Sequence, residues 1–208
     1  TKRPISVYPD LVVALAMVKQ ASARANREIG VLDPERADLI DRAAQRVIDG
    51  EFHDQFTVGV IQGGAGTSTN MNANEVITNI ALELAGREKG DYAFLSPIDH
   101  TNRSQSTNDV YPTAVKIGLS LTLRSLLEEL DLLRISFLHK SHEFHDVLKV
   151  GRTQLQDAVP MTLGQEFHGF ASTLGYDHTR LTENASLMFE INMGCLLYTS
   201  DAADDMQC

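Results

Sequence analysis

The sequence contains 208 residues, of which 43% are hydrophobic and 22% are charged, a balance that is typical of a globular chain and excludes a disordered one. The formal net charge is −10 and there is no basic block, which argues against binding to nucleic acid or an anionic membrane. No apolar run approaches the roughly 20 residues that a transmembrane helix needs. Cys195 and Cys208 are the two cysteines, so residues 1–194 hold no disulfide framework and a reducing cytoplasm is expected.

Two helices are predicted in the first quarter of the chain. Pro9 begins an apolar stripe, as proline does in a first helical turn, and Gly30 is expected to end that helix. Asp33 followed by Pro34 is typical of an N-cap and a first helical position, and this second helix should run to about Gly50. Its inward-facing residues are expected to be Leu39, Ile40, Ala43, Val47 and Ile48.

The next segment alternates between extended and helical patterns. Residues 56–61 are rich in β-branched side chains and predict an extended segment or strand. A glycine-rich loop at 63–66 follows, without the lysine of a P-loop or a GxGxxG motif, so nucleotide binding is not expected. A helix is predicted from about Asn72 to Gly86, and residues 90–103 read as irregular turns.

Two long helices are predicted in the second half, which makes the fold class all-α. The first should begin at Thr107 or Pro112 and end near Val147. Its apolar residues step by four and three, as in a coiled coil: Leu119, Leu123, Leu126, Leu130, Leu133 and Phe137. After a loop around Gly151, the second is marked by Leu163, Phe167, Phe170, Leu174, Leu181 and Met188. Because the first helix has more than one apolar face, both need further partners to bury them.

Three clusters of hydroxyl and amide side chains interrupt this helical pattern, at residues 66–70, 105–109 and 151–157. Ser, Thr, Asn and Gln donate hydrogen bonds to a carboxylate without adding a permanent charge. Each cluster is expected to precede a helix, whose N-terminus favours anions. The pattern therefore predicts a site for a small polyanion, although Ser106 or Thr107 could equally serve only as an N-cap.

The same clusters carry a family resemblance. The runs GGAGTSTNMNANEVI (63–77), SPIDHTNRSQSTNDVYPT (96–113) and VGRTQLQDAVPMTLGQEF (150–167) are similar to the aspartase/fumarase superfamily. Ser106-Thr107-Asn108 and Gln154 resemble its aspartate ammonia-lyase branch, because the fumarate hydratase branch usually has Ser-Ser-Asn and His at these places. Fumarate hydratase or another lyase acting on a succinyl substrate is the nearest alternative.

The resemblance implies an all-α, aspartase/fumarase-like fold. Residues 1–105 would form an N-terminal lyase domain whose start is truncated, and residues 106–194 the first part of a long central helical bundle. Residues 195–208 do not follow the family pattern and are predicted to be a non-native tail. Four identical subunits would share the bundle and build active sites between chains, without a cofactor or a metal.

The reaction that the resemblance implies is the reversible removal of ammonia from L-aspartate to give fumarate. Thr67, Ser106 and Thr107 match the family positions that bind the side-chain carboxylate. Positions that hold the amino group and the other carboxylate are matched by Asn108, Thr153 and Gln154. Since preorganised donors stabilise charge that develops in a transition state, these side chains are expected to supply much of the catalysis.

The remaining polar residues of these motifs are expected to have supporting roles. Arg103, Asp109 and Asp157 should orient the loops through ion pairs or hydrogen bonds. His100 matches a region that the family uses as a second anion site, but a satisfied structural histidine is an equal alternative. His139, His142 and His145 step around one helix and cannot all reach one ion, so they predict a solvated face rather than a metal site.

One part of the family's machinery does not occur in the sequence. The family's general base is a serine on a Gly-Ser-Ser loop, and a Lys-x-Asn motif that helps to bind the substrate follows it. Neither motif is present in the 208 residues, so the chain by itself is expected to be inactive although its parent protein is an enzyme. A non-catalytic helical oligomerisation fragment is the alternative from a different functional class.

Overall fold

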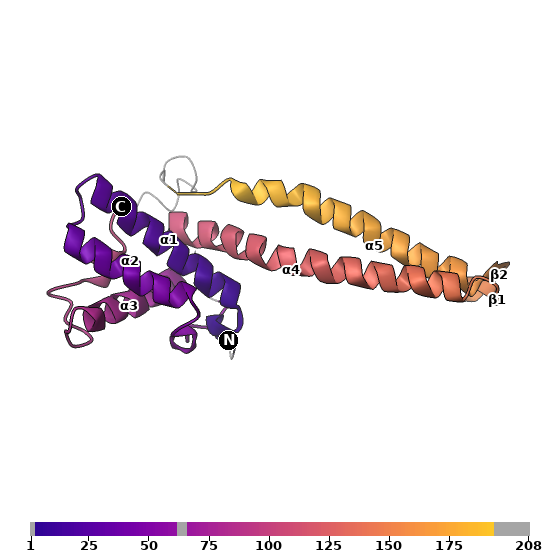
Figure 1. Cartoon of the computed structure of the whole chain (residues 1–208), viewed down its shortest axis with the longest axis horizontal. Coiled ribbons are helices and arrows are strands. Elements are labelled where there is room, and N and C mark those ends of the chain that lie inside the picture. The colour runs from indigo at the N-terminus through magenta and orange to yellow at the C-terminus, as the bar shows by residue number, and fades with distance from the viewer. Residues whose placement is uncertain (1–2, 62–65, 194–208) are drawn as a thin grey trace. The chain divides into compact units, whose positions relative to one another are not determined.

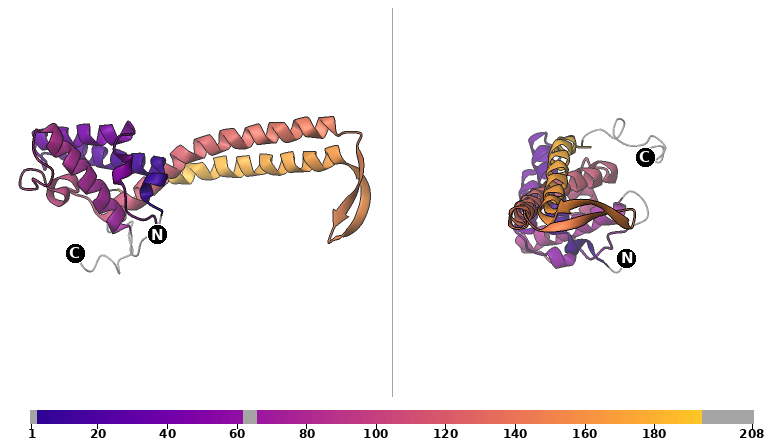
Figure 2. Two further views of the ribbon diagram at one scale, coloured as in Figure 1. Left: turned by 90° about the horizontal axis from the view of Figure 1, so that it is seen from below. Right: turned by 90° about the vertical axis from the view of Figure 1, so that its right-hand side faces the viewer.

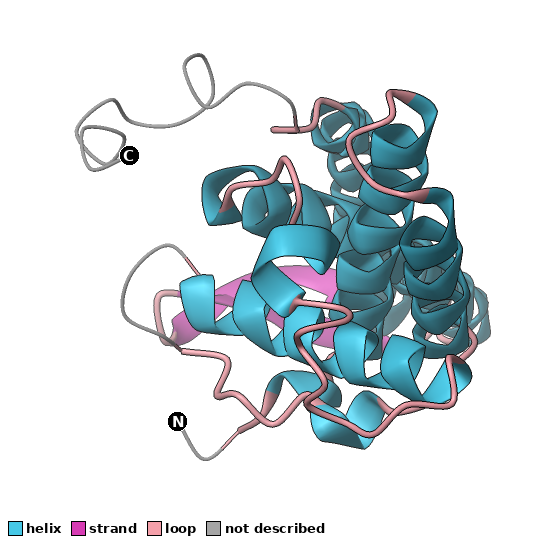
Figure 3. Ribbon diagram, turned by 90° about the vertical axis from the view of Figure 1, so that its left-hand side faces the viewer, coloured by secondary structure: helices cyan, strands magenta, loops and turns pink. Residues whose placement is uncertain are grey.

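The computed structural model describes residues 3–61 and 66–193, and its contacts divide the chain into two compact units. Among the described residues, the first unit consists of 3–61, 66–119 and 189–193, and the second unit consists of 120–188. Helices make up most of the described chain (Figure 3), which confirms the all-α prediction. Among the described helices, none is long and apolar enough to span a membrane.

The first unit is built around three helices, α1 (Pro9–Glu28), α2 (Pro34–Ile48) and α3 (Thr67–Leu84). A 3-10 helix, Ile5–Val7, precedes them, and another, His53–Gln55, follows α2. A π-helix, Pro97–Thr101, precedes α4 (Thr107–Glu143), which begins in the first unit. Figure 1 labels the four long helices.

The two predicted N-terminal helices are confirmed, and local chemistry explains their ends. Gly30 lies just beyond α1 with a φ of 78°, the left-handed conformation that glycine adopts without a steric cost. Asp33 caps α2, because its Oδ1 accepts the backbone N–H of Arg36 at 3.0 Å. Pro34 then occupies the first turn, where its missing N–H would have had no partner within the helix.

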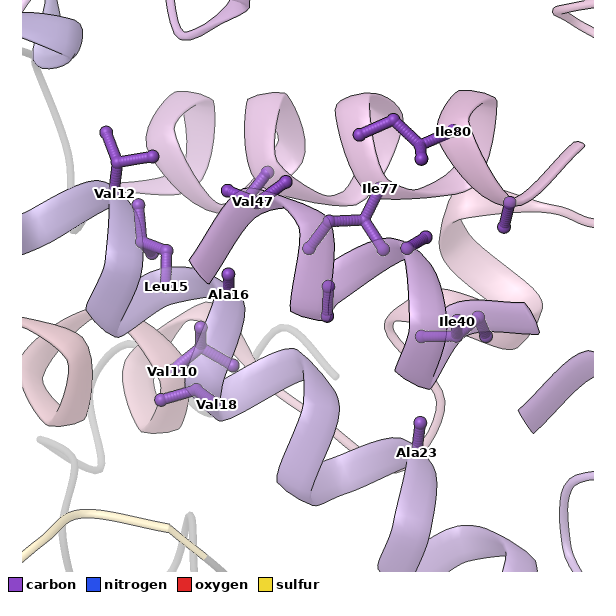
Figure 4. Packing of buried hydrophobic residues seen from close by; sticks show 14 of the residues in the cluster. Val12, Leu15, Ala16, Val18, Ala23, Ile40, Val47, Ile77, Ile80 and Val110 are labelled. Carbon is purple, nitrogen blue, oxygen red and sulfur yellow. The ribbon is translucent and has the colours of Figure 1, made fainter. Parts of the chain in front are cut away.

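The core of the first unit lies where α2 packs against α1 and α3. Figure 4 shows buried aliphatic side chains from all three helices in one cluster, together with Val110 of α4. As predicted, the inward face of α2 is buried at Leu39, Ile40, Ala43 and Val47, whereas Ile48 is only partly buried. Phe56 is also fully buried and covers one side of this cluster. These contacts make α3 and the first turn of α4 parts of one packed unit.

Two predictions for the segment between α2 and α3 are refined by the structure. Residues 56–61 form no regular strand; they pair with residues 3–6 through an isolated bridge between Pro4 and Gly59 and through backbone hydrogen bonds of 2.9–3.2 Å. The start of α3 was predicted at about Asn72 and is wrong, because α3 begins at Thr67. The apolar pattern misplaced this start because the first turns of α3 bury polar side chains, Thr69, Asn70 and Asn74, on the face where apolar residues were sought.

The second unit contains the rest of α4, a β-hairpin and α5 (Leu163–Ala185), and it ends within the 3-10 helix Ser186–Phe189. Within this unit α4 and α5 run side by side in opposite directions (Figure 2). Four aromatic rings join the two helices, with ring centroids 5.6–5.9 Å apart: Phe137, Phe144, Phe167 and Phe170. Several apolar residues of α4 stay exposed in this chain, including Leu126, Leu132, Leu133 and Ile135.

The segment around Gly151 differs from the prediction. It was expected to be a loop that opens a helix, whereas β1 (Leu148–Thr153) and β2 (Gln156–Thr162) pair as an antiparallel hairpin. The register shifts between Val150 and Arg152, and a Cβ added to Gly151 would lie 3.1 Å from the carbonyl oxygen of Val159, so a residue without a side chain fits there. The helix begins only at Leu163, after a capping box between Thr162 and Gln165.

Candidate functional site

The N-termini of α3 and α4 are held together through a buried lysine of α1. The Nζ of Lys19 donates to Oδ1 of Asn70 at 2.6 Å, to Oδ1 of Asn102 at 2.9 Å and to Oε1 of Gln105 at 2.9 Å. Asn70 lies in the first turn of α3, while Asn102 and Gln105 lie in the loop that leads into α4. One ammonium group therefore connects α1, α3 and the polar loop before α4.

The carboxamide of Asn102 is the second centre of this network. Its Oδ1 accepts the Nδ2 groups of Asn70 and Asn74, each at 3.2 Å, in addition to the Lys19 ammonium. Its Nδ2 donates to the carbonyl oxygen of Gln105 at 3.0 Å. Since buried polar groups are costly unless they are paired, these bonds fix the conformation of residues 102–105.

Three of the predicted carboxylate-binding residues lie at the two helix ends that the network joins. Thr67 occupies the first position of α3 and is exposed. Ser106 lies directly before α4 and Thr107 begins it, and both side chains are half-buried. The Nδ2 of Asn70 donates to Oγ1 of Thr107 at 3.0 Å, so α3 and α4 are bonded at this place.

Ser106 serves as the cap of α4, which confirms that alternative interpretation of its hydroxyl. Its Oγ accepts the backbone N–H of Asn108 at 3.2 Å, and its own N–H donates to Oδ2 of Asp109 at 3.3 Å. A hydroxyl that accepts one hydrogen bond keeps its hydrogen for donation elsewhere. Capping and ligand binding are therefore compatible at Ser106, and Asp109 orients this turn as predicted.

A glycine brings the two helix ends close together. Gly66 is the N-cap of α3, is buried, and has a φ of 85°. A Cβ added to it would lie 2.5–2.7 Å from ring atoms of Tyr111, in the first turns of α4. Any larger residue at Gly66 would push the Tyr111 ring away, so this contact sets the distance of Thr67 from Ser106 and Thr107.

The electrostatics of this cluster favour an anion. Both α3 and α4 begin at this cluster, and the N-terminus of a helix carries the positive end of its dipole. Lys19 lies behind them and is fully buried. Burial lowers the pKa of Lys19 well below its usual value, while three amide oxygens match the three N–H donors of an ammonium group.

Of the three other predicted binding residues, Asn108 lies in the first turn of α4 and is half-buried, while the remaining two lie in the second unit. Thr153 ends β1 and Gln154 follows it, and both are exposed. Gln154 and Leu155 form the hairpin turn with φ values of 48° and 62°, which a type I′ turn requires. Arg152 and Asp157 pair across the hairpin at 2.8 Å, so Asp157 orients this loop as predicted. That Thr153 and Gln154 share a site with Thr67, Ser106, Thr107 and Asn108 stays a prediction.

His100 and Arg103 take part in the structure of the loop before α4. Nδ1 of His100 accepts the backbone N–H of Ser96 at 2.8 Å. Burial, followed by the charge of Arg36, lowers the pKa of His100. Arg103 holds the loop through its carbonyl oxygen, which accepts Nδ2 of Asn26 at 2.8 Å. The structural interpretation of His100 is thus supported by a satisfied ring nitrogen.

Sequence reasoning missed the network behind the site. Lys19, Asn70, Asn74 and Asn102 were not singled out, although they hold the segments that were. A signal was present in α1, where one buried helical face changes from apolar to polar in the order Val12, Leu15, Lys19, Ser22, Asn26. A lysine at the centre of such a face, spaced three and four residues from its neighbours, indicates a buried cation with partners elsewhere.

Comparisons with known proteins show what the chain is similar to. The chain is 60% identical over 192 residues to the aspartate ammonia-lyase of Pseudomonas aeruginosa, and the aligned region covers 92% of this chain and 40% of that protein. It is 49% identical over 191 residues to the aspartate ammonia-lyase of Escherichia coli, with 91% and 40% covered. The chain therefore spans about two fifths of the length of these relatives.

Solved structures show the same architecture. The fumarate lyase:delta crystallin of Brucella melitensis superimposes with a TM-score of 0.87 at 52% identity, over 92% of this chain and 45% of that one. The class II fumarase of Schistosoma mansoni gives a TM-score of 0.77 at 34% identity, over 96% and 43%. These likenesses confirm the predicted aspartase/fumarase fold. The model of the family described as lyase matches residues 3–206, and the chain therefore belongs to this lyase family.

Proposed function

We propose that the protein is an aspartate ammonia-lyase, which eliminates ammonia from L-aspartate to give fumarate and runs the same reaction in reverse. The relatives of that name support it at 60% and 49% identity. The structural observation that carries it is the meeting of two hydroxyl-bearing helix N-termini, with Thr67 on α3 and Ser106 and Thr107 on α4, in front of the Lys19 ammonium. Such a place suits a carboxylate.

The reaction has one proton transfer and one bond cleavage. A base removes a proton from the carbon next to the side-chain carboxylate, and the electron pair of that C–H bond moves toward the carboxylate. The C–N bond then breaks, its electrons leave with the amino nitrogen, and a C=C bond forms without any oxidant. Negative charge peaks on the carboxylate between these steps, so fixed hydrogen-bond donors around it lower the barrier.

The six residues divide into two groups in this proposal. Thr67, Ser106 and Thr107 donate to the side-chain carboxylate, where the charge develops. The amino group and the other carboxylate are held by the remaining three, Asn108, Thr153 and Gln154. The base that the family resemblance implies, a serine on a Gly-Ser-Ser loop, is not among the six, so the base comes from another segment, which in a homotetramer with shared active sites can belong to a neighbouring subunit.

Exposed apolar residues along α4 and α5 support the tetramer, since a helix with several apolar faces needs partners to cover them. The proposal also places the protein in a reducing cytoplasm, which the lack of cysteine before residue 195 supports.

The test is a paired assay on the complete protein encoded by the gene. Ammonia and fumarate should form from L-aspartate, and L-malate should not be dehydrated. Fumarate from L-malate alone would identify a hydratase instead, and absence of both activities and of succinate binding would favour a helical oligomerisation module.

Thr107→Val tests the site itself, because it removes the hydroxyl and keeps the shape. Loss of one such donor should lower kcat by about 100- to 1000-fold. Thr78→Val is the control, because Thr78 is a helical threonine outside the candidate site and its hydroxyl pairs with Thr101 at 2.7 Å; it is fully buried, whereas Thr107 is half-buried. Equal activity of the two variants would contradict the proposed role of Thr107.

A further inference from the structure

The buried network behind the site has no part in the reaction described above. Lys19 is fully buried in α1, and its nearest partner is the Oδ1 of Asn70, at 2.6 Å. Asn70 is buried as well, with an exposed fraction of 1%. A buried ammonium group is costly to desolvate, and here three amide oxygens accept its three hydrogens and hold it at a defined point.

The Lys19 ammonium decides which way the Asn70 carboxamide faces. A carboxamide has an acceptor at one end and a donor at the other, and an ammonium group can only donate. Oδ1 of Asn70 must therefore face Lys19, and Nδ2 must face the other way. On that side Nδ2 lies 3.0 Å from Oγ1 of Thr107 and 3.2 Å from Oδ1 of Asn102.

The direction of Asn70 then decides the direction of the Thr107 hydroxyl. Since Nδ2 of Asn70 is a donor, Oγ1 of Thr107 must accept in this bond. The hydroxyl hydrogen is left to point elsewhere and to donate to an incoming carboxylate. If the Asn70 carboxamide were flipped, the Thr107 hydroxyl would donate its hydrogen to Oδ1 of Asn70. It would then present only lone pairs to the anion.

We propose that Lys19 and Asn70 are positioning residues, which through the bonds Lys19–Asn70–Thr107 hold the Thr107 hydroxyl as a hydrogen-bond donor toward the substrate carboxylate. This inference rests on the proposed function, in which Thr107 binds that carboxylate. It gives the buried lysine a specific task, which is to fix the polarity of a hydrogen-bond chain rather than to touch the substrate.

Three features of the network support this assignment. Oδ1 of Asn102 and Oε1 of Gln105 accept the two other hydrogens of the ammonium, so Lys19 cannot turn away from Asn70 without losing partners. The bond between Lys19 and Asn70 is buried and so is shielded from competing water, while the bond from Asn70 to Thr107 is partly buried. The backbone N–H of Asn70 is bonded to the carbonyl oxygen of Gly66 at 3.0 Å, which fixes the start of the side chain.

Asn70→Asp reverses the last bond of the chain. The introduced carboxylate keeps the shape of the side chain and can pair with Lys19, but it has no donor for Thr107. The Thr107 hydroxyl would then donate to that carboxylate and be lost to the substrate. Loss of a hydrogen bond to a charged group should raise the Kd for succinate by on the order of ten- to hundred-fold, and kcat for L-aspartate should fall as well.

Asn74→Asp is the matched control for the added charge. Asn74 is equally buried, and its Nδ2 donates to the same Oδ1 of Asn102 at 3.2 Å, but the hydrogen bonds of its side chain lead to Asn102 and Met71, not to Thr107. The difference between Asn70→Asp and Asn74→Asp therefore isolates the bond to Thr107 from the repulsion between a new carboxylate and the ligand. Circular dichroism of both variants checks that they fold.

A double-mutant cycle with Thr107→Val decides the proposal, with succinate affinity measured by calorimetry on the complete protein. If Asn70 acts through the hydroxyl, then in the Thr107→Val background Asn70→Asp should raise the Kd for succinate by no larger a factor than Asn74→Asp does. If Asn70→Asp weakens binding by the same factor with and without the hydroxyl, the inference is wrong. If Thr107→Val alone leaves succinate binding intact, the proposed function of Thr107 fails instead, so the two failures are distinguishable.

Lys19→Met provides a second measurement if Asn70→Asp does not fold. Without the ammonium the Asn70 carboxamide can adopt either orientation, so succinate affinity should drop by a smaller factor than in Thr107→Val, and only while the hydroxyl is present. Unchanged affinity in Lys19→Met would overturn the role of the lysine.

Discussion

Replacement of Gly66 by alanine should separate the two N-termini that form the candidate site. Gly66 has a φ of 85°, and the position of a Cβ on it lies 2.5–2.7 Å from the ring of Tyr111. Alanine therefore meets two penalties, one from the backbone conformation and one from the ring. The ring must therefore rotate away, or the first turns of α4 must move away from α3.

The size of the effect follows from those two penalties. A left-handed conformation costs a residue other than glycine about 1–2 kcal/mol. Forcing extra atoms into a packed contact costs about 1–3 kcal/mol more. Gly66→Ala should thus lower the free energy of unfolding by about 2–5 kcal/mol.

Gly86 is the matched control at the other end of α3. Its φ is 70°, but nothing lies within 4 Å of the position of an added Cβ. Gly86→Ala should therefore lower the free energy of unfolding only through the left-handed backbone conformation. Both variants share any gain that comes from a less flexible unfolded chain.

Urea denaturation followed by circular dichroism, together with succinate binding, tests this reasoning. Gly66→Ala should lose more stability than Gly86→Ala and should also lose succinate affinity, because Thr67 and Thr107 are no longer held at the same distance. Tyr111→Leu in the Gly66→Ala background should recover part of both losses. Equal destabilisation by Gly66→Ala and Gly86→Ala, with binding intact in both, would refute the role of the Gly66–Tyr111 contact.

Three further predictions concern stability. Burial lowers the pKa of Lys19 below the usual 10.5, so between the folded and the unfolded pKa the unfolded chain binds more protons than the folded chain. The free energy of unfolding should therefore rise with pH in that range. A pH series of denaturation midpoints should show this rise, and Lys19→Met should flatten it. Leu155 is 99% exposed with a φ of 62°, so Leu155→Gly should raise the urea midpoint by relieving about 1 kcal/mol, whereas Leu148→Gly in the regular part of β1 should lower it. Phe167→Ala removes three ring contacts and should destabilise the second unit by about 2–3 kcal/mol. Phe170→Ala removes two ring contacts and should destabilise it less. The opposite order in thermal melts would show that the cluster does not join α4 to α5.

Much of the helical framework was predictable because its signals are local. Asp33 and Pro34 start α2 through hydrogen bonds and backbone angles within one turn. Gly30 ends α1, because glycine adopts a left-handed conformation without a steric cost. The stepping of leucines along α4 likewise reflects a helical period that the sequence shows directly. Each of these features depends on residues no more than a few positions apart.

The hairpin and the start of α3 were not predictable in the same way. Gln154 and Leu155 adopt left-handed conformations without the Asn-Gly signal that usually marks such a turn, so pairing of β1 with β2 imposes the turn. The first turns of α3 look polar, and only their partners in α1 and before α4 make Asn70 and Asn74 core residues.

The sequence by itself determined the lyase family, the long helices and the hydroxyl-bearing segments of the candidate site. The tertiary structure decided how those segments are oriented, because the bonds that orient them join residues far apart in the chain. Lys19 reaches Asn70 across 51 positions and Gln105 across 86, while Asn70 reaches Thr107 across 37. A hydroxyl is donor or acceptor according to what faces it, and what faces Thr107 is fixed only when α1, α3 and α4 have packed together.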